Sequence, residues 1–171
     1  MLNSKCASSS IRRMAIYKLG YKDLIYLQTE EEINDCQIPR WIMVVRNPFD
    51  RIVSMWADKT QRKKLYRGFK NLNMQKGMPF NAFVKAIYSA GPLHKLNGHL
   101  WPQTIIAKYY WDRLDILKIE NLQEIWPKEL PPLEHENQTK LNIDYNKLLD
   151  KETRALIHEI YADDIGALPY E

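Results

Sequence analysis

Residues 41–54 read WIMVVRNPFDRIVS and carry the clearest structural signal in the chain. The five apolar residues Trp41–Val45 form a run that favours a buried strand. Asn47 suits the N-cap of a helix, Pro48 its first position, and Asp50 its first turn. The stretch therefore predicts a buried strand followed at once by a helix that runs toward Gln61.

The flanking segments continue this alternation of strands and helices. We predict further strands at Asp23–Gln28 and Asp115–Ile119, and helices at about Ser9–Leu19, from Pro79 to just before Gly91, at Asn121–Trp126 and at Asp150–Tyr161. Strands that alternate with helices indicate an α/β domain with a mainly parallel sheet. The 171 residues suit a single domain over residues 1–171.

Composition excludes several classes of protein. Hydrophobic residues make up 45% and charged residues 27%, which argues against disorder and against a coiled coil. The longest apolar run is Trp41–Val45, too short for a membrane span or for the core of a signal peptide. Cys6 and Cys36 form no zinc-binding pattern, although a single bridge between them stays open.

The net charge of +4 is unevenly distributed. Residues 59–76 contain no acid and several basic residues, namely Lys59, Arg62, Lys63, Lys64, Arg67, Lys70 and Lys76. Such a stretch suits an anionic ligand, and it equally suits a solvated helix face.

Familiar catalytic motifs are absent. The sequence contains no Walker A glycine–lysine pair, no G-x-G-x-x-G, no G-x-S-x-G and no H-E-x-x-H. The four histidines have no ligand spacing, so we expect no metal site.

Two stretches could instead bind anions. In Lys5–Ser10 (KCASSS) small residues and three hydroxyls lead into a predicted helix, although a plain capping turn would look the same. In the second stretch, Arg46 ends the buried strand and Ser54 follows two helical turns later, so the two could share one phosphate. The alternative is that Arg46 pairs with a carboxylate and Ser54 packs within its helix.

Together these stretches resemble the sulfotransferases that use 3′-phosphoadenosine 5′-phosphosulfate (PAPS). Lys5–Ser10 is similar to the family's 5′-phosphosulfate loop, and Arg46 with Ser54 matches its 3′-phosphate pair. The run RNPFDRIVS resembles the R-D/N-P-F/I/Y-E/D-R-L/I-V/Y-S of carbohydrate O-sulfotransferases of the chondroitin, dermatan and heparan type. Further similar segments are Asn97–Gln103 (NGHLWPQ), Leu114–Leu122, His135–Lys140 and Tyr161–Tyr170.

The resemblance implies a P-loop-like domain of three layers and a metal-independent, in-line transfer of a sulfuryl group from PAPS to a carbohydrate hydroxyl, with 3′-phosphoadenosine 5′-phosphate (PAP) as product. It assigns catalysis to Lys5 and His99, with His94 as the second candidate for the base. The implied cofactor-binding residues are Lys5, Cys6, Ala7, Ser8, Ser9, Ser10, Arg46, Ser54, Thr139 and Lys140. His99 could instead merely order its loop, and Thr139 and Lys140 could lie in a plain surface loop.

The chain also departs from the family pattern. Ala7 replaces the usual glycine, no proline precedes Lys5, and the expected first strand is missing or reduced to residues 1–3. Residues 10–46 contain no histidine, where several relatives place a base; Glu30, Glu31 or Glu32 could serve, but adjacent acids more often form a solvated turn.

Three other readings stay open. They are an inactive relative that binds PAP or PAPS, a kinase with a degenerate phosphate loop, and a basic nucleic-acid-binding module. We expect no nucleic-acid partner and no membrane span, and leave the oligomeric state undecided. Many relatives are Golgi membrane proteins, but we favour a soluble cytoplasmic enzyme of a microbe or virus.

Overall fold

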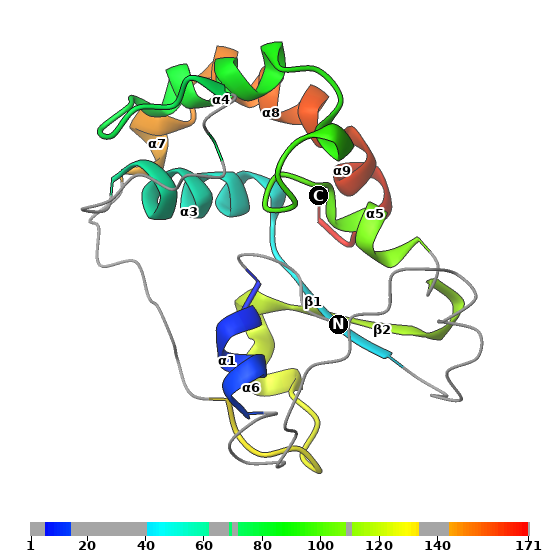
Figure 1. Cartoon of the computed structure of the whole chain (residues 1–171). Helices are drawn as coiled ribbons and strands as arrows, with labels where there is room; N and C mark the ends of the chain where they lie inside the picture. Colours follow the sequence, from blue (N-terminus) through cyan, green and yellow to red (C-terminus); the bar gives the residue numbers. More distant parts are fainter. Residues whose placement is uncertain are drawn as a thin grey trace. The chain divides into compact units, whose positions relative to one another are not determined.

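The computed structural model describes residues 6–14, 41–61, 69, 72–108, 111–133 and 144–170. The chain divides into two compact units (Figure 1). Unit 1 comprises Met1–Arg46 and Ile105–Gln138, and unit 2 comprises Asn47–Thr104 and Thr139–Glu171. Each unit is described by itself below.

Unit 1 contains the sheet. Strand β1 (Trp41–Val45) pairs in parallel with β2 (Leu114–Lys118), so that Trp41 faces Leu114 and Val45 faces Lys118. Its helical segments are α1 (Ser8–Arg13), η4 (Trp111–Arg113), η5 (Ile119–Asn121) and α6 (Leu122–Ile125). The predicted parallel α/β arrangement is confirmed for these two strands: β1 has the predicted bounds, and β2 begins one residue early.

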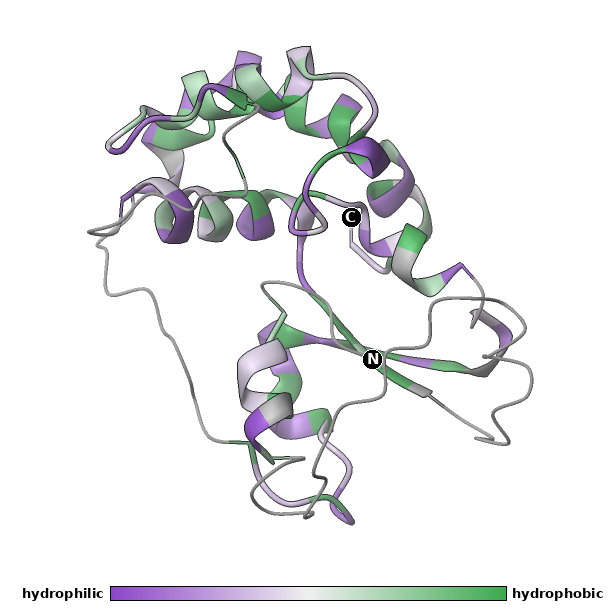
Figure 2. Cartoon of the chain, viewed as in Figure 1, coloured by the Kyte–Doolittle hydropathy of each residue, from purple (hydrophilic) through white to green (hydrophobic). Residues whose placement is uncertain are grey.

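A small apolar cluster joins the helices of unit 1 to the sheet. Cys6, Val44 and Leu122 are buried together, with Ile11 and Leu117 packed against them. Figure 2 shows β1 as a largely hydrophobic strand, as its unbroken apolar sequence predicts. Cys6 forms no disulfide, while Cys36 and the predicted strand at Asp23–Gln28 lie outside the described residues.

Unit 2 is helical. It contains α3 (Pro48–Thr60), α4 (Phe80–Ser89), η3 (Leu93–Lys95), α7 (Tyr145–Leu148), α8 (Lys151–Ile160) and α9 (Ala162–Ala167). Helix α5 (Gln103–Ala107) begins in unit 2, and its later residues belong to unit 1.

Local signals set the helix ends that we predicted. The Asn47 Oδ1 accepts a hydrogen bond of 2.9 Å from the Phe49 amide at the start of α3. The Asp150 Oδ1 accepts one of 2.7 Å from the Thr153 amide at the start of α8. Helix α4 ends before Gly91, whose φ of 84° lies in the left-handed region that glycine adopts readily.

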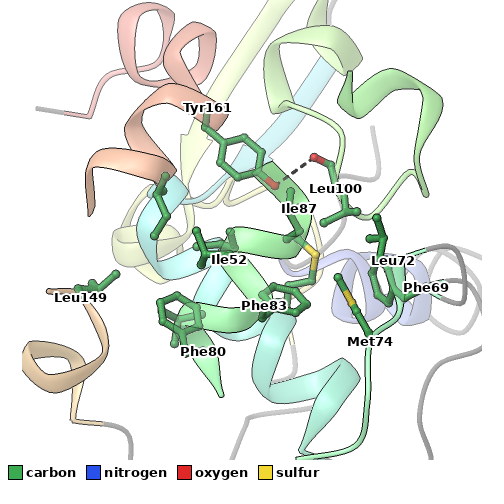
Figure 3. Packing of buried hydrophobic residues seen from close by; sticks show 14 residues of the cluster. Ile52, Phe69, Leu72, Met74, Phe80, Phe83, Ile87, Leu100, Leu149 and Tyr161 are labelled. Carbon is green, nitrogen blue, oxygen red and sulfur yellow. Dashed lines mark hydrogen bonds between the residues drawn. The ribbon is translucent and has the colours of Figure 1, made fainter. Parts of the chain in front are cut away.

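The core of unit 2 lies among α3, α4 and α8. Its members include Ile52, Met55, Phe80, Phe83, Ile87, Leu100, Ile157 and Tyr161 (Figure 3). Trp56 meets Phe80 edge to face, with 5.5 Å between the ring centroids. Within the described part of the chain, no helix is long and apolar enough to cross a membrane.

Candidate functional site

The strand, turn and helix of residues 41–60 position two of the residues predicted to bind a phosphate. Arg46 is half-buried and follows the carboxyl end of β1, where open α/β sheets bind their ligands. Ser54 is half-buried near the middle of α3, every residue of which is at least partly covered. Arg46 belongs to unit 1 and Ser54 to unit 2, so the structure describes each in its own unit.

The predicted phosphate loop turns sharply into α1. Cys6 is fully buried against Val44 of β1, and the Ile11 amide bonds to the Ala7 carbonyl at 3.0 Å. Ala7 has a φ of 55°, in the left-handed region. That conformation costs a residue with a Cβ about 1–2 kcal/mol, and it explains why a glycine suits this position.

The hydroxyls after Ala7 differ in exposure. Ser8 is half-buried, Ser9 is exposed and Ser10 is buried. Small side chains and successive amides at such a turn can approach an anion closely. Several predicted residues lie outside the described part of the chain, namely Lys5, Glu30, Glu31, Glu32, Thr139 and Lys140.

His99 lies in a tight turn of unit 2 that we call the His99 loop, residues 97–101. The His99 amide donates to the Asn97 Oδ1 at 3.0 Å, and the Leu100 amide donates to the Asn97 carbonyl at 2.8 Å. The His99 side chain is half-buried, with its Nδ1 atom buried. By contrast His94, the second candidate, is exposed in η3.

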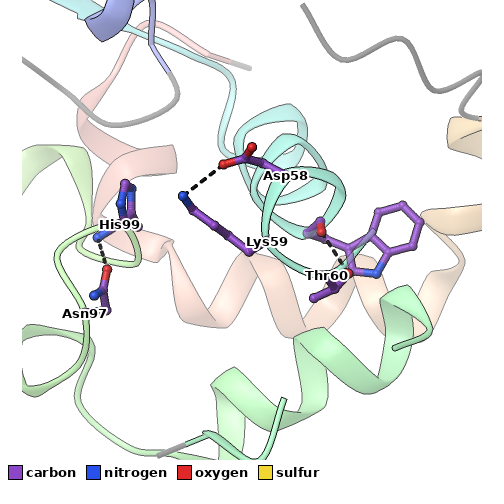
Figure 4. A network of polar contacts seen from close by, with 6 residues as sticks. Asp58, Lys59, Thr60, Asn97 and His99 are labelled. Atoms are coloured by element: carbon purple, nitrogen blue, oxygen red, sulfur yellow. Dashed lines mark hydrogen bonds and ion pairs between the residues drawn. The ribbon is translucent and has the colours of Figure 1, made fainter. Parts of the chain in front are cut away.

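Figure 4 shows a charged pair of α3, Asp58 and Lys59, beside this loop. The Lys59 ammonium lies 2.9 Å from the Asp58 carboxylate, and only 12% and 11% of the two side chains is exposed. Figure 4 shows the Lys59 side chain directed toward His99. The sequence predicted Lys59 only as part of a basic stretch. The position of its partner could have been inferred more closely, because Asp58 follows Ser54 by four residues and so lies on the same face of the helix. Of the remaining stretch, Lys76 is exposed and residues 62–68 and 70 are not described.

Buried polar side chains hold the His99 loop from inside unit 2. The Arg51 guanidinium donates to the carbonyls of His99 at 3.3 Å and Trp101 at 2.8 Å. The Tyr161 hydroxyl donates to the Leu100 carbonyl at 3.1 Å, and the Arg51 guanidinium lies 5.8 Å from the centre of the Tyr161 ring. Burial raises the pKa of Tyr161 to about 12, so its hydroxyl stays protonated to a higher pH than that of an exposed tyrosine.

Asp164 anchors the end of the same segment. Its buried carboxylate accepts hydrogen bonds of 2.9 Å from each of the Gln103 and Thr104 amides. It also accepts one of 3.0 Å from the Thr104 hydroxyl and one of 3.4 Å from the Gln103 side-chain amide. The carboxylate thus caps α5 from another part of the chain. Sequence reasoning noticed the segments that contain Asp164 and Tyr161 but gave these residues no role.

Comparison with known families identifies the class of protein. The model of the sulfotransferase family matches residues 4–171. The chain belongs to the sulfotransferase family. The resemblance seen in the phosphate loop and in RNPFDRIVS is therefore confirmed at the level of the family, which makes the protein a sulfuryl transferase. No curated protein and no solved structure shows a significant match to the chain.

Proposed function

We propose that this sulfotransferase moves a sulfuryl group from PAPS to a hydroxyl of a carbohydrate acceptor. The observation that carries the proposal is the run RNPFDRIVS, which follows the carboxyl end of a parallel strand and forms a capped helix. The family match over residues 4–171 supports the sulfuryl-transfer part of the proposal. The complete fold proposed is a P-loop-like domain of three layers, of which β1 and β2 with their helices are part.

The proposed donor site uses both anion-binding stretches. The loop from Lys5 to Ser10 would hold the 5′ end of PAPS, and Arg46 with Ser54 the 3′-phosphate. The left-handed backbone at Ala7 supports this assignment, because it gives the loop the turn that glycine gives relatives. Lys5 would stabilise charge on the leaving phosphate, while Thr139 and Lys140 would close over the nucleotide. PAPS supplies the activated sulfuryl group.

The proposed acceptor site is the His99 loop. Transfer forms a bond between the acceptor oxygen and sulfur and breaks the bond from sulfur to the bridging phosphate oxygen. The acceptor hydroxyl must lose its proton, and a neutral imidazole at His99 would accept it. The half-buried position of His99 within a hydrogen-bonded turn suits that role.

Calorimetric titration with PAP tests the donor site. We expect wild type to bind PAP in preference to ADP and AMP. Arg46→Ala should weaken binding by about 10–100-fold because it removes a charge-assisted hydrogen bond, and Ser54→Ala by about 2–10-fold. Lys128→Ala, an exposed basic residue of unit 1, is the control and should leave the affinity unchanged.

The outcomes separate the competing functions. Equal binding of ADP and PAP, or no effect of Arg46→Ala, would contradict the donor site and favour a kinase. Selective PAP binding without transfer from PAPS to a panel of neutral and acidic oligosaccharides would instead indicate an inactive relative. Transfer that His99→Asn abolishes, with PAP affinity retained, would support both halves of the proposal.

A further inference from the structure

The His99 loop receives an unusual set of hydrogen bonds. Three successive backbone carbonyls, those of His99, Leu100 and Trp101, accept from side chains buried in unit 2. The donors are Arg51 of α3 and Tyr161 at the junction of α8 and α9, each only 1% exposed. Figure 3 shows the Tyr161 hydroxyl directed at Leu100.

A buried guanidinium needs a reason, because an apolar side chain of similar volume avoids the cost of desolvating a charge. Here two of the guanidinium's hydrogen bonds go to the turn that carries His99. The centre of the Tyr161 ring lies 5.8 Å from the guanidinium. The Tyr161 hydroxyl donates to the carbonyl of Leu100, the residue between His99 and Trp101. These three hydrogen bonds therefore converge on one short backbone segment.

Both main-chain polar groups of His99 form hydrogen bonds. Its amide donates to Asn97 Oδ1, and its carbonyl accepts from Arg51. Asp164 fixes the chain a few residues later through the amides of Gln103 and Thr104. The backbone from the His99 carbonyl onward is thus tied to the interior of unit 2, and the His99 amide is tied to the loop itself.

We infer that Arg51 and Tyr161 are positioning residues that hold the backbone of His99 in the orientation required for proton transfer. The inference rests on the proposed role of His99 as the base. A proton acceptor works only within hydrogen-bond reach of the reacting hydroxyl, and a displacement of about 1 Å costs on the order of 100-fold in rate. Arg51 and Tyr161 act through His99 and take no part in the chemistry themselves.

Tyr161→Phe is the sharpest test, because it removes one oxygen and one hydrogen bond. Tyr88→Phe is its matched control, since Tyr88 also donates a single hydrogen bond, to Glu159, but on the exposed side of α4. We expect Tyr161→Phe to lower kcat by about 10–100-fold with PAP affinity retained. Tyr88→Phe should leave kcat within a factor of about two, the scatter of a neutral surface change.

Arg51→Lys extends the test with a second matched pair. Both hydrogen bonds come from the Nη2 atom of Arg51. Lysine keeps the charge but loses the rigid, planar group that holds this nitrogen between the two carbonyls. The control is Arg154→Lys on α8, where the guanidinium also bonds one carbonyl, that of Leu149, and lies 5.6 Å from the Phe49 ring centre. Only the Arg51 variant should lose kcat.

The double variant His99→Asn/Tyr161→Phe shows whether Tyr161 acts through His99. We expect it to be no slower than His99→Asn alone, because a misplaced base adds nothing once the base is gone. Full additivity of the two losses would overturn the inference, as would a Tyr161→Phe enzyme no slower than Tyr88→Phe.

Amide hydrogen exchange separates failure of the inference from failure of the proposed function. If His99→Asn is fully active, His99 is not the base and the proposed mechanism fails. The positioning contacts themselves are then judged by exchange, which should accelerate at the amides of residues 99–101, 103 and 104 in Tyr161→Phe and remain unchanged there in Tyr88→Phe. Unchanged exchange in both variants would overturn the positioning role.

Discussion

The proposed phosphate loop of unit 1, residues 5–10, and the His99 loop of unit 2 are shaped by different means. In the phosphate loop, Ala7 adopts a left-handed conformation, and the first turn closes from Ile11 to Ala7. In the His99 loop, donors arrive from residues 48–61 positions away in the sequence. The first loop depends on residue size and backbone conformation, whereas the second depends on polar side chains buried elsewhere in its unit.

The largest expected effect comes from Asp164→Ala. Removing a buried carboxylate that accepts four hydrogen bonds leaves the start of α5 unsatisfied. We expect the free energy of unfolding in urea to fall by about 3 kcal/mol, since each buried donor left unpaired costs about 1–3 kcal/mol. The exposed neighbour Asp163 provides the control, and Asp163→Ala should change it by less than about 0.5 kcal/mol. Equal losses of stability in the two variants would show that the hydrogen bonds of Asp164 to α5 do not stabilise unit 2.

A smaller effect tests the phosphate loop. Ala7→Gly relieves the left-handed strain of about 1–2 kcal/mol, but glycine adds about 0.5–1 kcal/mol of backbone entropy to be lost on folding. We therefore expect a net stabilisation of about 0–1.5 kcal/mol in urea unfolding, with PAP affinity retained. The same substitution within helix α4, Ala86→Gly, should instead destabilise by about 1 kcal/mol. A loss in both variants would contradict the conformation of Ala7.

The smallest effect concerns a local contact in unit 2. Backbone and side-chain hydrogen bonds from Thr153 lower the pKa of Asp150 below its usual value of 3.8. A lowered pKa in the folded state means stability that is present above pH 3.8 and lost as the pH falls through the folded-state value. Asp150→Asn keeps a good N-cap without the charge. Its free energy of unfolding in urea should therefore equal that of wild type at pH 7 and fall less on acidification. A steeper acid loss in the variant would contradict this account.

Sequence reasoning succeeded where neighbouring residues set the structure. The bounds of β1, the N-caps at Asn47 and Asp150, and the stop of α4 before Gly91 all follow from local chemistry. Helix α1 begins at Ser8, one residue before the predicted start, and residues 15–19 of that prediction are not described. Errors of one residue are expected where hydrogen bonds at an element's end outweigh composition.

The contacts that hold the His99 loop were beyond local reasoning. Arg51 in a sequence looks like any arginine on an amphipathic helix, and nothing beside it indicates that its partners are His99 and Trp101. The same holds for Asp164, whose acidic neighbour Asp163 is exposed. Tertiary packing decides which of two adjacent carboxylates is buried, and the residues themselves do not.

Helix α3 combines several demands in one segment of 13 residues. It carries Ser54 on a half-buried face, Arg51 beneath the His99 loop, and Ile52 and Met55 in the core. Few substitutions along α3 should therefore be tolerated, because its residues contact the core and the His99 loop and include a proposed donor-binding residue.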